Sequence, residues 1–410
     1  MKTEICIIGA GPAGLMAAIS AGRAGARVVA VEANTSPGRK LLLTGGGRCN
    51  LTHRASPQEL VRAFGAGGRF ISYSVYRFSP QGVQDFFTRL GLRLKIENDG
   101  CVFPASGRAS DVKEALVGRA GTLGAKLLYG RRVGDVDTDA GYFIVQTPKE
   151  KISADKLIVA TGGLSWPRTG STGDGYRLAR QFGHTVTRTR ASLVPLVTRE
   201  TWPAQLAGTA VDKVKISARI DNKRVTSVGA VIFTDDGIGG PAVLDMSRHL
   251  TDHLPASGTP ISLTLDLAPQ IERAKLESKV TERIAANPRK KVVNVLAEFV
   301  PKRLSVFLCE HANCNEDLPA GQLKKDMRKA LVRLLKKLPL SIVRTRPIAE
   351  ATVTRGGVNI KEIEPKTMES KICPGLFFAG EVLDVDGPCG GFNLQACWST
   401  GDLAGSSAAL

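Results

Sequence analysis

Short apolar runs alternate with helical stretches over residues 1 to about 190. Ile5–Ile8 and Val28–Val31 are apolar throughout and too short for a helix, so each predicts a buried strand. Residues 110–123 carry a helical pattern with Asp111 near its start. Residues 129–137 and 142–147 alternate like a hairpin or meander. This order of elements predicts an α/β domain built on a doubly wound parallel sheet.

The pattern changes twice in the middle of the chain. Residues 213–220 alternate cleanly between apolar and polar positions, and 228–234 follow as a second strand, which predicts a small barrel or sandwich. From residue 269 to 338 the pattern is helical, and prolines interrupt it. Residues 348–353 then predict a strand that returns to the first domain.

Three glycines and one acid frame the first strand–helix–strand unit. Gly9, Gly11 and Gly14 follow the first strand as G-x-G-x-x-G, and Glu32 ends the second strand. In this motif the first glycine permits a tight turn, the second lets the backbone approach a pyrophosphate, and the third lets the helix pack closely. An acid after the second strand can accept hydrogen bonds from a ribose. The spacing therefore predicts a dinucleotide site.

Two later strands also end in small residues. Residues 155–159 lead into Ala160–Gly163, and residues 375–378 lead into Gly380 and Glu381. A glycine turn at 387–391 then opens a last helix. This arrangement resembles flavoproteins of the glutathione-reductase type, in which the last helix points its N-terminus at the flavin and favours the reduced form.

Because the motifs lie at both ends of the chain, the two ends are expected to share one sheet and the middle to be an insertion. We expect residues 1–192 and 345–410 to form a discontinuous FAD-binding domain. Residues 193–268 are expected to form an inserted β subdomain, which can also include 339–348. Residues 269–338 are expected to form a basic helical subdomain.

The charge balance is the unusual part of the composition. The 410 residues carry a net charge of +18. Residues 270–346 contain 18 Lys or Arg and 8 Asp or Glu, so more than half of the excess lies in under a fifth of the chain. Two interpretations are open: a solvated helix face, or a phosphate-binding surface that contacts folded RNA. The candidate RNA-binding residues are Arg289, Lys290, Lys291, Lys324, Lys325, Arg328, Lys329, Lys336 and Lys337.

Other bulk features are ordinary. No apolar stretch reaches the ~18 residues of a membrane span, no signal-peptide pattern is present, and the eight cysteines show no disulfide spacing. These features predict a cytoplasmic protein with reduced thiols and no membrane partner. The sequence does not indicate an oligomeric state.

The segment Gly38–Asn50, which contains Gly-Gly-Gly-Arg-Cys-Asn, resembles the hallmark of the BaiN/YhiN-type flavoproteins, also labelled the aminoacetone oxidase family or NAD(P)/FAD-dependent oxidoreductases. Residues 160–163, 354–358 and 384–395 resemble other landmarks of that family. The resemblance implies FAD, a three-part architecture and a redox function. Members have been linked to amine oxidation, steroid double-bond reduction and uridine reduction in ribosomal RNA. The residues expected to hold FAD are Gly9, Gly11, Pro12, Ala13, Gly14, Glu32, Arg39, Lys40, Gly46, Gly47, Asn50, Thr161, Gly162, Gly380, Glu381, Gly390, Gly391, Phe392 and Asn393.

The chain departs from the family pattern at two places. Asp235 stands where the family usually has a histidine, which puts any role of that histidine in doubt here. Cys389 stands where a threonine is common, and so puts a thiol where a hydroxyl would lie near the flavin. The candidate catalytic residues are Cys49, Arg48, Cys389 and His53. For each, a packing or surface role is the alternative; Arg48 could position an anionic group or pair with a local carboxylate.

Two features bear on metals and electron supply. Cys309, His311 and Cys314 lie within six residues, but a structural zinc site takes four ligands and no paired C-x-x-C is visible, so no metal is expected. No second G-x-G-x-x-G follows a strand, so no dedicated nicotinamide domain is expected. Electrons would come from NAD(P)H visiting transiently, from a partner reductase, or from the substrate itself with oxygen as the acceptor.

Three functions are compatible with these residues. The first is reduction of a uridine C5–C6 double bond in structured, most simply ribosomal, RNA by hydride transfer from reduced flavin. The second is a small-molecule flavin oxidase or reductase whose basic surface is incidental. The third is a flavin-dependent RNA-binding or assembly factor without turnover. The local charge excess favours the first.

Overall fold

The computed structural model describes residues 1–254 and 259–410, which divide into two compact units. The first unit comprises Met1–Ala191 with Ile348–Leu410, and the second comprises Ser192–Pro347. Within the described residues no helix is long and apolar enough to cross a membrane.

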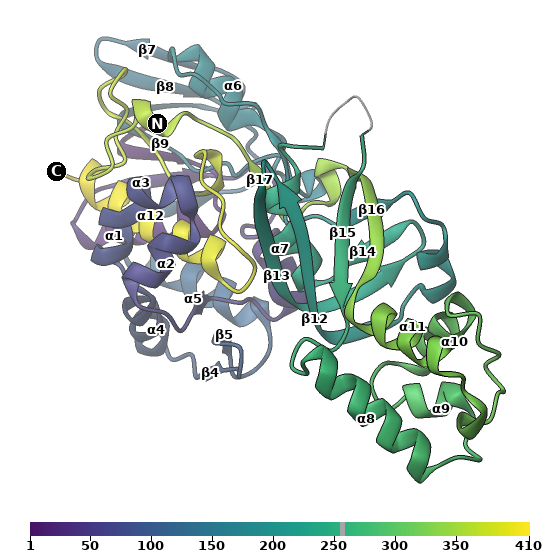
Figure 1. The fold of residues 1–410 in the computed structure, drawn as a ribbon. Coiled ribbons are helices and arrows are strands. Elements are labelled where there is room, and N and C mark those ends of the chain that lie inside the picture. Colours follow the sequence, from purple (N-terminus) through teal and green to yellow (C-terminus); the bar gives the residue numbers. More distant parts are fainter. Residues whose placement is uncertain (255–258) are drawn as a thin grey trace. The chain divides into compact units, whose positions relative to one another are not determined.

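A seven-stranded sheet forms the centre of the first unit (Figure 1). Its order is β6-β2-β1-β9-β8-β7, and β18 pairs with β9 beside this path. Pairs β1–β2, β1–β9, β2–β6 and β9–β18 are parallel, which is the doubly wound part, whereas β7 and β8 form an antiparallel extension. The strands are β1 (Lys2–Ile8), β2 (Val28–Val31), β6 (Lys126–Leu128), β7 (Val136–Asp139), β8 (Tyr142–Gln146), β9 (Lys151–Val159) and β18 (Leu376–Phe378).

Helices and a small second sheet complete this unit. The helices are α1 (Pro12–Arg23), α2 (Pro57–Ala63), α3 (Gly68–Arg77), α4 (Pro80–Arg89), α5 (Ala109–Thr122), α6 (Asp174–Gln181) and α12 (Phe392–Ala408). The small sheet has the order β3-β5-β4, with β3 (Thr52–His53), β5 (Cys101–Pro104) and β4 (Leu94–Ile96). β17 (Val353–Arg355) lies in this unit, and β10 (Arg190–Ser192) ends at its boundary.

Small residues allow α1 and α12 to pack side by side (Figure 1). A side chain at Gly401 would overlap the Ala13 carbonyl, and one at Gly405 would overlap the Ala17 carbonyl. The helix backbones therefore approach each other closely at these two points. The packing brings together the helix after the first glycine motif and the helix after the last glycine turn.

The second unit is a closed six-stranded barrel with helices that share its core. The barrel order is β11-β14-β13-β12-β15-β16. Its strands are β11 (Leu196–Thr198), β14 (Gly237–Gly239), β13 (Lys223–Thr234), β12 (Ala210–Ile220), β15 (Ile261–Asp266) and β16 (Leu338–Thr345). The helices are α7 (Pro241–Leu250), α8 (Arg273–Ala286), α9 (Val292–Leu296), α10 (Lys302–His311) and α11 (Lys325–Lys336).

The doubly wound α/β fold with a barrel subdomain is confirmed, and two local expectations are wrong. Residues 348–350 form a short 3₁₀ turn, and the strand begins at Val353 instead of spanning 348–353. Residues 129–135 belong to no strand; strands lie on either side of them, at 126–128 and 136–139. The finer division of the insert into separate β and helical parts stays a prediction, because apolar residues of barrel and helices form a single core cluster.

Candidate functional site

The predicted motif residues meet at one edge of the sheet. Ile8 of β1 is in register with both Val31 of β2 and Val159 of β9, and Phe378 of β18 is in register with Val159. The C-terminal ends of these four parallel strands therefore lie side by side at the same edge of the sheet. The segments that follow them start at Gly9, Glu32, Ala160 and Ala379. The carboxyl edge of a parallel sheet is where such folds bind ligands.

The three glycines of the first motif lie in three different surroundings. Gly9 has φ +101°, and a side chain there would overlap the Ala160 carbonyl. A side chain at Gly14 would overlap the Gly9 carbonyl, so the helix can pack this closely only with glycine. At Gly11 an added Cβ would meet no atom within 4 Å. Gly9 and Gly14 therefore serve the turn and the packing, and Gly11 leaves open space in front of the helix start.

This open space has the electrostatics of an anion site. Gly11 is the N-cap of α1 and Pro12 its first residue, so Ala13 and Gly14 belong to the first turn. Backbone N–H groups of a first turn have no partner inside their helix, and the helix dipole adds positive potential there. The predicted cofactor residues Pro12 and Ala13 lie in this first turn, and their contact with a pyrophosphate stays a prediction.

Glu32 organises the loop beside this space. One carboxylate oxygen accepts from the Ala10 N–H at 2.9 Å; the other accepts from the Asn34 N–H at 2.9 Å and from Asn34 Nδ2 at 2.7 Å. Arg39 donates to Asn34 Oδ1 at 2.9 Å. Glu32 is buried, so these contacts fix its direction while its remaining lone pairs stay available as acceptors for hydroxyl groups.

Lys40 and Glu381, predicted from segments 341 residues apart, form an ion pair. Lys40 Nζ lies 2.6 Å from Glu381 Oε2 and 2.6 Å from Ser165 Oγ. Glu381 Oε1 accepts from Ser165 Oγ at 2.8 Å and from the Thr354 N–H at 2.9 Å. Sequence reasoning missed Ser165 and did not assign a role to Thr354, although Thr354 lies in a segment recognised as a family landmark. Gly380, with φ +77°, sets the direction of Glu381.

Thr161 and Gly162 follow β9, and Thr161 carries a buried hydroxyl group. Thr161 Oγ1 is buried and has no hydrogen-bond partner among the described residues. Gly162 follows with φ +75° and would place a side chain 3.0 Å from Ser171 Oγ. The hydroxyl packs against Gly175 at the start of α6, where an added Cβ would overlap it, so it faces protein atoms.

The Gly-Gly-Gly-Arg-Cys-Asn segment, residues 45–50, begins inside an irregular 3₁₀ stretch over Leu41–Gly47. Gly45, Gly46 and Gly47 all have positive φ, and at Gly46 an added Cβ would meet no atom within 4 Å. Arg48 lies outside any anionic pocket: its Nη1 lies 2.8 Å from Glu97 Oε1, and its guanidinium lies 4.1 Å from the centre of the Phe103 ring. Of the two roles left open for Arg48, pairing with a local carboxylate is the one seen.

The residues after this segment hold the glycine turn that begins α12. Oriented by its neighbours, the Asn50 amide donates to the Thr52 carbonyl at 3.0 Å and accepts from the Gly391 N–H at 3.2 Å. His53 Nδ1 donates to the Gly390 carbonyl at 3.1 Å, and its ring stacks on Phe392 with centres 5.0 Å apart. Because a carbonyl only accepts, Nδ1 of His53 carries the proton.

Two further bonds fix the same segment to the helix. Thr52 Oγ1 donates to Gln395 Oε1 at 2.6 Å, and Trp398 Nε1 donates to the Leu51 carbonyl at 2.9 Å. Asn393 closes the turn from the other side, accepting from the Gly387 N–H at 2.7 Å. We call residues 50–53 the clamp segment. The clamp segment and the start of α12, far apart in sequence, therefore form one rigid assembly.

The two candidate cysteines differ in exposure. Cys49 is completely buried, and burial raises the pKa of its thiol to about 12, so the thiol keeps its proton. Cys389 is half-buried and lies directly before the glycine turn at Gly390. Asp235, at the position of the family histidine, is exposed in the tight turn between β13 and β14.

The predicted RNA-binding residues separate into two groups. Some already have partners: Lys290 Nζ lies 3.0 Å from Glu298, Lys291 Nζ 2.5 Å from Asp317, and Lys336 Nζ 2.7 Å from Asp266. Arg328 is half-buried, and its Nε has no partner in the described part of the chain. The remaining members are exposed and make no ion pair among the described residues: Arg289, Lys324, Lys325, Lys329 and Lys337.

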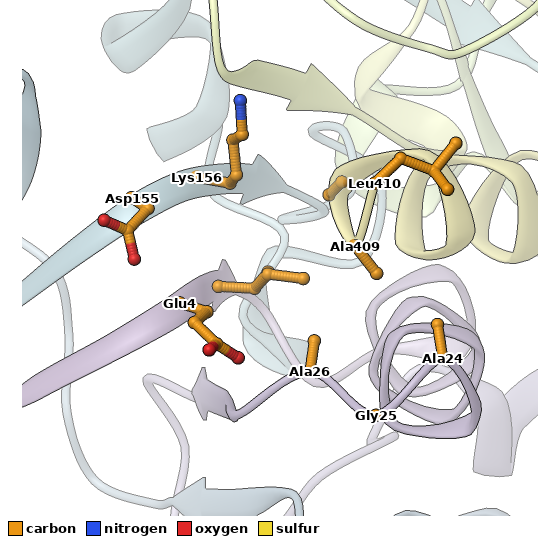
Figure 2. Close-up of a pocket in the computed structure, with 10 residues that line it drawn as sticks. Glu4, Ala24, Gly25, Ala26, Asp155, Lys156, Ala409 and Leu410 are labelled. Atoms are coloured by element: carbon orange, nitrogen blue, oxygen red, sulfur yellow. The ribbon is translucent and has the colours of Figure 1, made fainter.

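The cysteine–histidine cluster and one surface pocket lie outside the glycine motifs. Among residues 1–254 and 259–410, no group of three His, Cys, Asp or Glu is arranged to hold a metal; His311 Nδ1 bonds instead to the Phe307 carbonyl at 3.0 Å. The pocket in Figure 2 is lined by Glu4 and Asp155 and by the residues that follow α1 and α12. These are the C-terminal ends of both helices, opposite to the glycine motif.

Comparison with known proteins identifies the family. The family model described as the HI0933-like protein Rossmann domain matches residues 3–407, and the chain belongs to this family. It is 34% identical over 409 residues to a 3-dehydro-bile acid delta(4,6)-reductase of Clostridium scindens, covering 99% of both chains. It is 33% identical over 402 residues to a ribosomal RNA dihydrouridine synthase of Escherichia coli, covering 97% of this chain and 96% of the relative.

Solved structures share the fold. A flavocytochrome c3 fumarate reductase matches with a TM-score of 0.54 and 17% identity, covering 100% of this chain and 78% of the other. A 3-ketosteroid-delta4-(5alpha)-dehydrogenase of Rhodococcus jostii matches with a TM-score of 0.53 and 18% identity, covering 100% and 97%. The protein is an FAD-dependent oxidoreductase. Gly11 fits this cofactor, because the open space in front of the α1 N-terminus suits a pyrophosphate.

Proposed function

We propose that this protein reduces the C5–C6 double bond of a uridine in structured ribosomal RNA. The observation that carries the proposal is a row of exposed cations on α11. Lys325, Lys329 and Arg333 are exposed at four-residue spacing, so they share one face of the helix, with Lys324 and Lys337 at its two ends. Like charges at this spacing destabilise an isolated helix, and a polyphosphate partner would offset that cost.

The relatives support the same chemistry. Ribosomal RNA dihydrouridine synthases of Escherichia coli and Haemophilus influenzae match over 97% of this chain at 33% and 32% identity. The bile acid reductase matches at 34%. The names of these relatives describe reductive chemistry at a carbon–carbon double bond.

We assign the chain's residues two roles: most would hold the cofactor, and one would donate a proton to the substrate. When bound, reduced FAD supplies the hydride. The first turn of α1 would bind the pyrophosphate, Glu32 would accept from the ribose, and Lys40 with Glu381 would contact polar atoms of the cofactor. The N-terminus of α12, fixed by the clamp segment, would direct its positive potential at the flavin.

We assign the proton donor to Cys389. A general acid must be reachable by substrate and must still hold its proton. Cys49 holds a proton, but it is completely buried and a substrate cannot reach it. Cys389 is half-exposed beside the glycine turn.

RNA would be held by the unpaired cations of α11 together with Arg289. Lys290, Lys291 and Lys336 already neutralise local carboxylates, so they would contribute less. NAD(P)H, visiting transiently, would supply the electrons. A ribosomal RNA substrate would place the reaction in the cytoplasm.

The decisive experiment is a comparison of RNA from wild-type and deletion strains. Nucleosides from ribosomal and transfer RNA are quantified by mass spectrometry. One dihydrouridine in ribosomal RNA should disappear on deletion and return with a plasmid copy, whereas transfer RNA should not change. An unchanged ribosomal dihydrouridine content would overturn the proposal.

The second candidate function is reduction of a small enone, which the 34% identity to the bile acid reductase favours. Here the α11 cations would be a solvated face. Purified protein that oxidises NAD(P)H with a 3-keto steroid enone but is not retained by RNA at low salt would support this alternative.

A further inference from the structure

Helix α3 presents two tyrosines to solvent on one face. Tyr73 is 45% exposed and Tyr76 is 57% exposed, although the opposite face of the helix buries Phe70, Ile71 and Val75. Residues three apart lie on the same side of a helix. A single exposed aromatic is ordinary, whereas two on one helix face expose aromatic surface that a partner can cover; we call Tyr73 and Tyr76 the platform.

The charge around this platform is positive. Arg69 is exposed one turn before Tyr73, and α3 contains no Asp or Glu. Arg62 is exposed on the preceding helix α2. Aromatic rings flanked by exposed guanidinium groups fit the bases and phosphates of an unpaired strand, because every base has a face for stacking and every phosphate carries a negative charge.

The platform begins next to the glycine turn. A Cβ at Gly67 would lie 3.4 Å from Val385 Cγ1, and one at Gly387 would lie 2.8 Å from the Phe64 ring. The start of α3 is therefore packed against residues 385–387, which lead into Gly390 and α12. At 1.5 Å rise per residue, Tyr73 and Tyr76 lie about 7 and 12 Å further along the helix axis from Gly68.

The helix is firmly attached at its other end. Arg77 Nη2 donates to Ser406 Oγ at 3.1 Å, and Arg77 Nε lies 3.5 Å from Asp402 Oδ2, both on α12. The two tyrosines therefore stand on a rigid element between two anchored ends. A rigid platform loses little conformational entropy when a base stacks on it.

We propose that Tyr73 and Tyr76 stack on unpaired RNA bases that flank the target nucleotide, and that Arg69 contacts their phosphates. The proposal rests on the RNA substrate argued above and adds a second contact surface, separate in sequence from the α11 cations. A base to be reduced must leave its stack, so its neighbours need a surface that replaces the lost stacking. The platform lies along α12, between the glycine turn, which the start of α3 packs near, and the last turns of α12, which Arg77 contacts.

The test measures binding of the FAD-loaded protein to two labelled RNAs by fluorescence anisotropy. One is a single-stranded oligouridylate of roughly twelve nucleotides, within the span of known single-strand sites. The other is a base-paired RNA duplex of the same length. The double variant Y73A/Y76A should bind the single strand roughly 10- to 100-fold more weakly, since each stacked base contributes roughly 5- to 150-fold. Its affinity for the duplex should not change.

Two controls keep the result specific. Y73F/Y76F retains the rings without the hydroxyls and should bind like wild type. I372A removes another large apolar side chain, 45% exposed in the same unit, and should also bind like wild type. Thermal unfolding and flavin absorbance check that each variant is folded and loaded.

The outcomes separate the two proposals. Y73A/Y76A binding the single strand as tightly as wild type, while wild type makes dihydrouridine, overturns the platform and leaves the uridine reduction standing. Wild type that binds neither RNA overturns both. A change of the variant's mass in solution, with RNA binding unchanged, would assign the face to contact between copies of the chain and overturn the platform.

Discussion

Gly11 and Gly14 are three residues apart and serve different purposes. At Gly11 the backbone is extended, with φ −79°, and an added Cβ meets nothing within 4 Å. At Gly14 the same Cβ overlaps the Gly9 carbonyl. The motif in the sequence predicted both roles, because strand, glycines, helix and acid follow at the expected spacing. The contacts that each glycine avoids are visible only in the folded chain.

This difference yields a paired prediction. G11V should fold, with unfolding of the apoprotein within about 1 kcal/mol of wild type. It should lose FAD affinity by about 100-fold or more, ~3 kcal/mol, because the side chain fills the space needed by the pyrophosphate. G14V should instead lose about 3 kcal/mol of stability through overlap with backbone. Flavin absorbance near ~450 nm and urea unfolding distinguish the two; a yellow G11V protein would contradict the assignment.

Cys389 gives the second residue-scale prediction. If its thiol donates the proton, C389V should slow product formation by about 10²- to 10⁴-fold. C389T restores the hydroxyl common in the family at this position and should retain much of the rate. Stopped-flow reduction of the flavin by NADPH should be the same in both variants, since that step precedes protonation of the substrate. Equal product formation by C389V and wild type would remove Cys389 from the mechanism.

At the scale of elements, the sequence predicted which strands form and missed how loops join them. Buried runs such as Ile5–Ile8 and Val28–Val31 are unambiguous, since their apolar length fits a strand and little else. The prediction of a strand at 348–353 is wrong, because residues 348–350 form a 3₁₀ turn and β17 begins only at Val353. The clamp segment could not be found from sequence either: its bonds to Gly390, Gly391 and Gln395 join residues more than 300 positions apart.

The clamp segment carries the element-scale prediction. N50A removes the acceptor for the Gly391 N–H and should loosen the start of α12. A helix N-terminus that points less accurately at the flavin stabilises the reduced form less. We expect the flavin midpoint potential to fall by about 30 mV, which corresponds to ~1.4 kcal/mol for a two-electron couple. L43A, which shortens an exposed side chain of the neighbouring segment, is the control and should leave the potential unchanged.

At the scale of the whole molecule, the positive charge is unevenly distributed along the chain. Within the basic region, some cations form ion pairs and others form none among the described residues. The sequence located the excess in residues 270–346, but it could not separate paired from unpaired cations. Lys290, Lys291 and Lys336 are next to acids contributed by distant segments or a different turn, so their partners depend on folding. The unpaired set on α11 is therefore a property of the folded unit.

The last prediction tests that set against the total charge. Reversing Lys324, Lys325, Lys329 and Arg333 to glutamate removes up to four phosphate contacts. The slope of log affinity for structured RNA against log salt should become shallower by roughly 3, since each contact contributes about 0.7 to 0.9. The matched control reverses four exposed lysines of the first unit, Lys95, Lys149, Lys151 and Lys366, and changes the net charge equally. Flavin spectra should be unchanged in both. If the two quadruple variants lower the slope to the same extent, the effect is general electrostatics and α11 is a solvated face; a larger change for the α11 variant assigns the phosphate contacts to that helix.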